Sequence, residues 1–145
     1  MNSEKIEILL VEDNPGDVEL ILLAFEESKL KNMVHVVTDG QMAIDYVFAQ
    51  GAFRDRIEPK IIILDINLPK LDGHEVLQIL KKDINYRRIP VIMLTTSSAD
   101  RDILHAYDEY VNAYLNKPID FGDFVEIVKK IEGFWFEIVR LPKSG

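Results

Sequence analysis

The sequence contains no cysteine among its 145 residues. This absence excludes disulfide bonds, thiolate metal sites and cysteine nucleophiles. A chain without disulfides also suits a reducing compartment, so we expect the protein to be cytoplasmic. Any catalytic or metal-binding side chain of the protein must therefore carry a carboxylate, hydroxyl, amine or imidazole.

Long apolar runs are missing as well. No stretch approaches the roughly 20 apolar residues that cross a bilayer. The opening MNSEKIEILL lacks the basic region, the long apolar core and the small-residue cleavage site of a signal peptide. We therefore expect no membrane partner. With 48% hydrophobic and 29% charged residues, the chain has the composition of one globular domain spanning residues 1–145.

Positive charge is scarce relative to negative charge. The 17 Lys and Arg residues face 25 Asp and Glu residues, which gives a net charge of −8 and a pI near 4.9. Nucleic-acid binding needs clustered positive charge, so no nucleic-acid partner is expected. The pairs Lys81-Lys82 and Arg87-Arg88 are short and indicate a solvated helix end. The three histidines are too scattered to have the spacing of zinc ligands.

Short β-rich apolar runs alternate with stretches of helical spacing. Strands are expected at residues 6–11, 34–38, 60–65, 90–96 and 113–116. Apolar residues from Val18 to Phe25 recur at i, i+3, i+4 and i+7, which predicts a helix after the first strand. A stripe from Val76 to Ile84 predicts a helix after the third strand, and one around Ile103 predicts a helix after the fourth.

This alternation predicts a doubly wound α/β fold: a five-stranded parallel sheet with helices on both faces. The last helix should begin near residue 121 and extend to about residue 140. The polar connection QGAFRDRIEP (50–59) is expected to be a surface loop. In open parallel sheets, ligands bind beyond the carboxyl ends of the strands, so the functional site is expected at that edge.

Charged and hydroxyl side chains stand at this edge, at or just after the carboxyl ends of four of the predicted strands. They are Glu12, Asp13, Asp65, Thr95 and Lys117. Three close carboxylates repel one another unless a cation neutralises them, and oxygen ligands suit Mg²⁺. A carboxylate beside such an ion can act as a nucleophile toward phosphorus and form an aspartyl phosphate. The lysine would then pair with one phosphoryl oxygen, and the threonine would donate a hydrogen bond to another.

Each of these residues also has an ordinary structural explanation. Asp13 precedes Asn-Pro-Gly-Asp, which is typical of a turn and a helix cap. Asp65 and Thr95 suit the ends of strands, and Lys117 taken alone suits a surface position. The hypothesis of a phosphoryl-transfer site therefore depends on their convergence at one edge of the sheet.

Four motifs, in order, resemble the receiver domain of two-component response regulators over almost the full chain. They are LLVEDNP (9–15), ILDINLPKLDG (63–73), PVIMLTT (90–96) and AYLNKP (113–118). The resemblance implies a flavodoxin-like sheet with strand order 2-1-3-4-5, as in single-domain chemotaxis receivers. The VEDNPGD opening, the long connection before the third strand and the extended last helix resemble the receivers that partner bacterial phytochromes.

The resemblance implies that Asp65 is the phosphoacceptor and receives its phosphoryl group from a histidine of a sensor kinase, here of the phytochrome type. It implies a magnesium or manganese site formed by Glu12, Asp13, Asp65 and the carbonyl oxygen of Asn67. Many family members have aspartate where this chain has Glu12, which leaves open whether Glu12 touches the metal directly or through water.

The resemblance also implies which residues contact the phosphoryl group and respond to it. Thr95 and Lys117 would contact the phosphoryl group, and Tyr114 would be an aromatic switch residue that turns inward when Thr95 moves. This describes a phosphorelay switch that signals through altered protein contacts and turns over no separate substrate.

The tail IEGFWFEIVRLP (131–142) carries more apolar residues than one buried helix stripe needs. We expect a homodimer through the last helix and its neighbouring strand, with Phe134 and Trp135 in the interface. The alternative is that these side chains cap the lower edge of the core. Because the chain ends soon afterwards, we expect its output to be a contact made by the receiver itself.

Three other functions are open on the sequence. An aspartyl-phosphate hydrolase of the haloacid-dehalogenase type needs an acid two residues after the nucleophile, where this chain has Asn67. A nucleotide- or flavin-binding module needs a Gly-rich turn after the first strand, where this chain has acids. A degenerate receiver would bind partners without phosphorylation, which the complete acid, threonine and lysine set argues against.

Overall fold

The computed structural model describes residues 5–29, 31–96, 113–117 and 120–140, without the side chains of residues 113, 131 and 134–140. The helix expected around Ile103 lies outside the described residues. The elements are β1 (Ile6–Val11), α1 (Pro15–Glu26), β2 (Asn32–Val37), α2 (Gly40–Val47), the 3-10 helix η1 (Gly51–Phe53), β3 (Ile61–Asp65), α3 (Gly73–Lys82), β4 (Val91–Thr95), β5 (Ala113–Asn116) and α5 (Phe121–Arg140).

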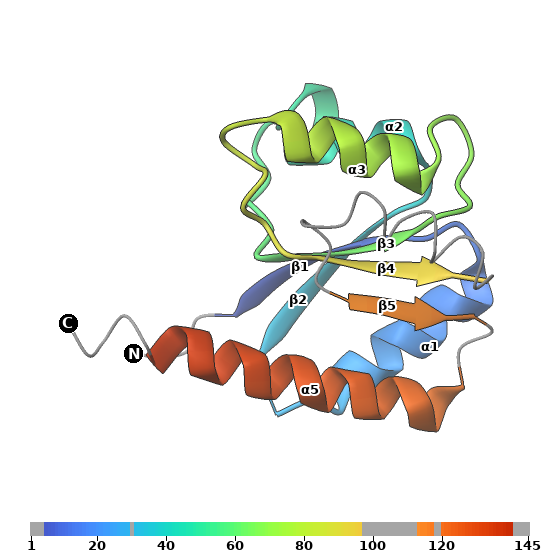
Figure 1. The fold of residues 1–145 in the computed structure, drawn as a ribbon, viewed down its shortest axis with the longest axis vertical. Helices are drawn as coiled ribbons and strands as arrows, with labels where there is room; N and C mark the ends of the chain where they lie inside the picture. The colour runs from blue at the N-terminus through green and yellow to red at the C-terminus, as the bar shows by residue number, and fades with distance from the viewer. Residues whose placement is uncertain (1–4, 30, 97–112, 118–119, 141–145) are drawn as a thin grey trace.

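The strands form one parallel sheet in the order β2-β1-β3-β4-β5. Helices α2 and α3 cover one face of the sheet, and α1 and α5 cover the other (Figure 1). The predicted doubly wound fold and its strand order are therefore confirmed. All five residues of β3 and all five of β4 are buried, as expected for central strands covered on both faces.

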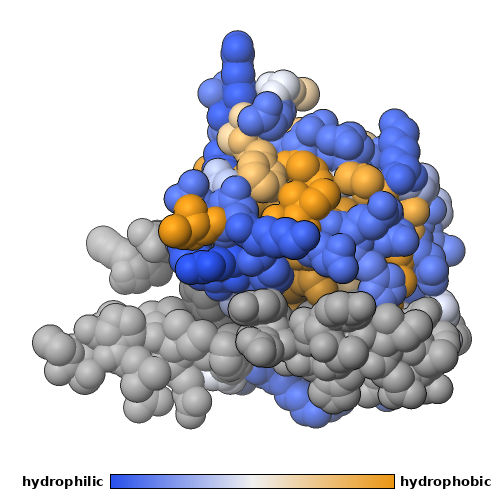
Figure 2. All heavy atoms as spheres, turned by 45° about the horizontal axis from the view of Figure 1, so that its top comes forward, coloured by the Kyte–Doolittle hydropathy of each residue, from blue (hydrophilic) through white to orange (hydrophobic). Residues whose placement is uncertain are grey.

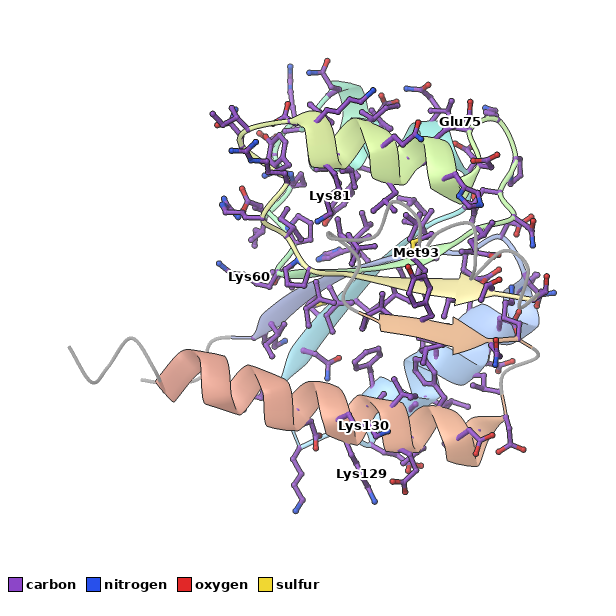
Figure 3. All side chains as sticks on the ribbon, viewed as in Figure 1. Lys60, Glu75, Lys81, Met93, Lys129 and Lys130 are labelled. Carbon is purple, nitrogen blue, oxygen red and sulfur yellow. The ribbon has the colours of Figure 1, made fainter. Side chains whose placement is uncertain are left out.

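Two hydrophobic clusters fill the spaces between the sheet and its helices. Successive side chains of a strand point to opposite faces, so Leu9 and Val11 join the cluster under α2 and α3. Ile8 and Leu10 point to the other face and join the cluster between the sheet and helices α1 and α5. This second cluster contains the edge-to-face pair of Phe25 and Phe124. Met93 of β4 lies between the sheet and α3 (Figure 3).

Side-chain caps set the starts of α1 and α3. The Asn14 side chain accepts a hydrogen bond from the Asp17 amide at 2.9 Å, with proline in the first helical position. Asp72 and Glu75 form a reciprocal capping box at α3. These capping residues determine where each helix begins, and therefore where it leaves the sheet edge.

The predicted stripe of α3 is wrong at its last member. The helix ends at Lys82, because Asp83 adopts an extended conformation and its side chain accepts hydrogen bonds from the Asn85 and Tyr86 amides. Ile84 is consequently 75% exposed instead of buried. Exposed apolar residues of this kind occur among hydrophilic side chains on the face shown in Figure 2 and are ordinary in a folded surface.

The expectation of a solvated basic helix end is also wrong for Lys81. Its ammonium donates hydrogen bonds to the carbonyl oxygens of Arg87 (2.9 Å) and Ile89 (2.7 Å), so it closes the turn between α3 and β4 (Figure 3). Burial of this group lowers the pKa of Lys81 to about 8.

The connection at residues 50–59 is at the surface, as predicted, but it is anchored. It contains η1, and Arg56 donates hydrogen bonds to the carbonyl oxygens of Tyr46 (2.9 Å) and Val47 (2.5 Å) at the end of α2. The Arg56 guanidinium also lies 5.8 Å from the centre of the Tyr86 ring. These contacts tie the connection to the rest of the fold.

A close backbone approach at Gly40 gives a test of the fold. A Cβ atom there would lie 1.9 Å from the Leu71 carbonyl oxygen, whereas one at Gly133 would meet nothing within 4 Å. We predict that Gly40→Ala lowers the free energy of unfolding by about 2–4 kcal/mol, since the backbone must shift. Gly133→Ala should leave it unchanged or raise it by up to about 1 kcal/mol. Urea unfolding of both variants measures this, and equal midpoints would contradict it.

Candidate phosphoryl-transfer site

Parallel pairing brings the ends of the strands together at one edge of the sheet. Asp65 is the last residue of β3, Thr95 is the last of β4, Glu12 follows β1, and Lys117 follows β5. Glu12 and Thr95 are fully buried, and Asp65 is 2% exposed. Buried polar groups are costly unless they have partners, so the contacts of these side chains define the site.

Lys117 is the centre of the cluster. Its Nζ lies 3.0 Å from Glu12 Oε1, 3.0 Å from Asp17 Oδ2 and 3.1 Å from Asp65 Oδ2. Burial alone would lower the pKa of Lys117, but its hydrogen bonds to Glu12 and Asp17 and the charge of Asp65 raise the pKa overall. The lysine is therefore a fixed cation held by carboxylates from three elements of the fold.

The pKa of Glu12 indicates that the positive charge of Lys117 does not neutralise all the carboxylates of the site. Burial, together with the hydrogen bond and the charge of Asp65, raises the pKa of Glu12 to about 7. The Lys117 ammonium and the Asn14 amide, 3.0 Å from Glu12 Oε2, oppose this rise without cancelling it. Negative charge therefore remains uncompensated at this edge of the sheet.

A metal ion is the group that fits this excess charge. Carboxylate oxygens of Glu12, Asp13 and Asp65 lie within 4.8 Å of one another, and Asp13 is exposed to solvent. Oxygen donors alone suit a hard divalent ion such as Mg²⁺ or Mn²⁺. Asn67 lies beside them: its amide donates a hydrogen bond to Asp65 Oδ1 at 3.1 Å, and its side chain donates one to Thr96 at 3.4 Å.

The expected switch residues lie on the two neighbouring strands. The Thr95 carbonyl accepts a hydrogen bond from the Lys117 amide at 2.8 Å, which connects the threonine to the lysine through the backbone. Tyr114 is partly buried and packs against the cluster under α2 and α3. Residues 97–112, between these strands, lie outside the described residues.

The sequence pattern does not identify one residue of the cluster. The sequence pattern assigns Asp17 to a turn and helix cap, whereas its carboxylate lies 3.0 Å from the Lys117 ammonium. A signal was available, because a helix that starts four residues after β1 places its first turn at the same sheet edge. The expected dimer residues Phe134 and Trp135 lie in α5, but their side chains are outside the described part of the chain.

Comparison with known proteins agrees with this geometry. Residues 8–129 match the response regulator receiver domain. The chain belongs to this family. It is 39% identical over 137 residues to response regulator Rcp1 of Synechocystis, covering 94% of this chain and 93% of Rcp1.

Solved structures of receivers are similar over nearly the whole chain. The phosphorylated cyanobacterial phytochrome response regulator RcpA superposes with a TM-score of 0.81 at 42% identity, covering 92% of this chain and 95% of RcpA. The Mn²⁺-bound form of Rcp1 superposes with a TM-score of 0.79 at 38% identity, covering 90% and 94%. The receiver is thus similar to phytochrome response regulators, and its cluster of Glu12, Asp13 and Asp65 could hold a metal ion, as in receiver domains.

None of the helices in the described ranges is long and apolar enough to cross a membrane.

The raised pKa of Glu12 predicts how metal binding depends on pH. Below about pH 7 this carboxyl holds a proton that a bound cation must displace, so affinity should rise with pH and level off above 7. We predict an affinity for Mg²⁺ about tenfold higher at pH 8 than at pH 6, measured by titration calorimetry. Glu12→Gln should bind more weakly and lose most of this dependence. Equal wild-type affinities at the two pH values would contradict the prediction.

Proposed function

We propose that this receiver is a phosphorylation-activated switch that accepts a phosphoryl group on Asp65 from a histidine of a sensor kinase. The observation that carries the proposal is the convergence of Asp65, Glu12 and Lys117 through contacts of 3.0–3.1 Å at the ends of three parallel strands. Similarity to phytochrome response regulators supports a phytochrome-type kinase as the partner.

In the transfer step, an Asp65 carboxylate oxygen bonds to phosphorus while the phosphorus–nitrogen bond of the phosphohistidine breaks. The imidazole leaves, and an acyl phosphate remains. Lys117 and Thr95 supply donors to the phosphoryl oxygens. Glu12, Asp13, Asp65 and the Asn67 carbonyl would hold a divalent cation, which when bound neutralises charge on the transferring group. Hydrolysis of the acyl phosphate resets the switch, and no separate substrate is turned over.

Phosphorylation at Asp65 changes the surface of the domain through Thr95 and Tyr114. Thr95 is fully buried and is connected to Lys117 through its carbonyl. A new phosphoryl group draws the threonine hydroxyl toward it, which vacates space that Tyr114 enters from its partly buried position. The surface around β4 and β5 then differs between the two states, and partner affinity changes with it.

The residues of the site support a hydrolase less well than they support the switch. Asn67 occupies the position of the required acid, and an amide cannot deliver a proton as a carboxylic acid does. Its side chain is already bonded to Thr96. A degenerate receiver is also disfavoured, because acids, hydroxyl and amine are all present and in contact or adjacent.

Self-association is the second part of the proposal. Helix α5 has 20 residues and is therefore roughly 30 Å long, whereas its neighbour β5 has four residues. The C-terminal end of α5 projects beyond the sheet (Figure 1). A projecting helix whose sequence has more apolar residues than one buried stripe needs gains from a partner, so we propose a homodimer through α5 and β5 with Phe134 and Trp135 in contact.

Phosphorylation at Asp65 is tested with acetyl phosphate and Mg²⁺, followed by intact mass measurement. The wild-type chain should gain the mass of one phosphoryl group, and Asp65→Asn should gain none because an amide is not a nucleophile toward phosphorus. Asp123→Asn, which removes an exposed acid from the first turn of α5, should behave as wild type. A wild-type chain that gains no mass would refute the proposed function.

The dimer is tested by sedimentation equilibrium. Phe134→Ala and Trp135→Ala should each weaken association by tenfold or more, since buried aromatic side chains at interfaces typically contribute about 2 kcal/mol or more. Glu126→Ala, an exposed position on the same helix, should keep the dimer. Molecular weights that do not change in the two aromatic variants would refute this interface.

A further inference from the structure

Asp17 contributes a third carboxylate to the Lys117 ammonium. It lies in the first turn of α1, and its Oδ2 is 3.0 Å from Lys117 Nζ. The Asp17 side chain is 19% exposed and that of Lys117 is 11% exposed, so water competes weakly for the pair. The Asn14 cap uses the Asp17 backbone amide, which leaves the Asp17 carboxylate available for the lysine.

The three carboxylates around the lysine differ in what the reaction does to them. An ammonium has three protons, and three carboxylate oxygens, from Glu12, Asp17 and Asp65, lie within 3.1 Å of its nitrogen; hydrogen bonds run to Glu12 and Asp65, and Asp17 forms an ion pair. Asp65 becomes an acyl phosphate, so its oxygen loses the negative charge that attracts the lysine. Glu12 belongs to the proposed metal ligands. Asp17 alone among the three has no other proposed role in the transfer.

We propose that Asp17 is a positioning residue for phosphoryl transfer. It holds the Lys117 ammonium in place from α1 while the lysine exchanges Asp65 for a phosphoryl oxygen. Without this third contact, the long and flexible lysine side chain must be ordered during the transfer itself, which slows the step. The inference rests on the proposed function, because it assigns Asp17 a part in that same reaction.

A simpler role for Asp17 makes a different prediction. An acid in the first turn of a helix stabilises the helix through its dipole, and removing it would then affect stability alone. A second possibility is that the Asp17 charge repels an anionic phosphodonor, in which case removing it would speed the transfer. The direction of the rate change separates these two roles from positioning.

The test compares three substitutions in the full chain. Asp17→Asn keeps the shape and removes the charge, and Asp17→Glu keeps the charge on a longer side chain. Asp123→Asn is the matched control, since it removes an acid from the first turn of α5. For each protein, the rate of phosphorylation is measured across acetyl phosphate concentrations, together with Mg²⁺ affinity and the unfolding midpoint.

We expect Asp17→Asn to lower the limiting rate about five- to tenfold, because a charge-assisted contact to the lysine is lost. The half-saturating acetyl phosphate concentration and the Mg²⁺ affinity should change by less than about threefold, since Asp17 is not among the proposed ligands. Asp17→Glu should recover at least half of the loss, and Asp123→Asn should match wild type. An unchanged or faster rate in Asp17→Asn, or an equal loss in Asp123→Asn, would overturn the inference.

A second readout is independent of phosphorylation. In ¹⁵N NMR of the resting protein, the Lys117 ammonium signal, identified by its loss in Lys117→Arg, should be sharp because three carboxylates within 3.1 Å surround it. Asp17→Asn should broaden it through faster exchange with water, and an unchanged signal would overturn the inference. If the wild-type chain accepts no phosphoryl group, the proposed function fails, while this signal still decides whether Asp17 holds the lysine.

Discussion

The fold of this receiver depends at its functional edge on one ammonium group shared by three carboxylates. Lys117 joins the ends of β1, β3 and β5 to the first turn of α1 through Glu12, Asp65 and Asp17. Buried carboxylates are tolerated only when they are paired and hydrogen-bonded, so without the lysine these acids would not be stable together. The same contact therefore stabilises the strand ends and assembles the reactive groups.

The geometry also explains how Asp65 is presented. Four buried apolar residues precede it in β3, which anchors the backbone in the interior. Its Oδ1 accepts a hydrogen bond from the Asn67 amide and its Oδ2 lies by Lys117, so both oxygens are oriented. The loop that carries Asn67 is fixed in turn, because the Gly73 amide donates to the Ile66 carbonyl and a Cβ at Gly73 would lie 2.4 Å from the Asp65 carbonyl oxygen. A carboxylate on so rigid a support costs little entropy to align with a phosphodonor.

The sequence predicts the strands, most of the helices and the site because these depend on local pattern and on parallel topology. Central strands appear as continuous apolar runs, and their ends must share one edge, so the sequence pattern alone places Asp65 close to Lys117. The features that the sequence does not predict depend on how far individual side chains extend and on which groups they contact. Ile84 leaves the α3 stripe because Asp83 forms a local turn, and Asp17 joins the site because its carboxylate extends from a helix that also needs a cap.

The central claim is that the cluster directs phosphoryl transfer to Asp65 and to no neighbouring acid. Its most direct test is to phosphorylate the protein, reduce the acyl phosphate with borohydride and map the modified residue by peptide mass spectrometry. The account predicts that Asp65 alone is converted to homoserine. Conversion of Glu12, Asp13 or Asp17 in place of Asp65 would contradict it.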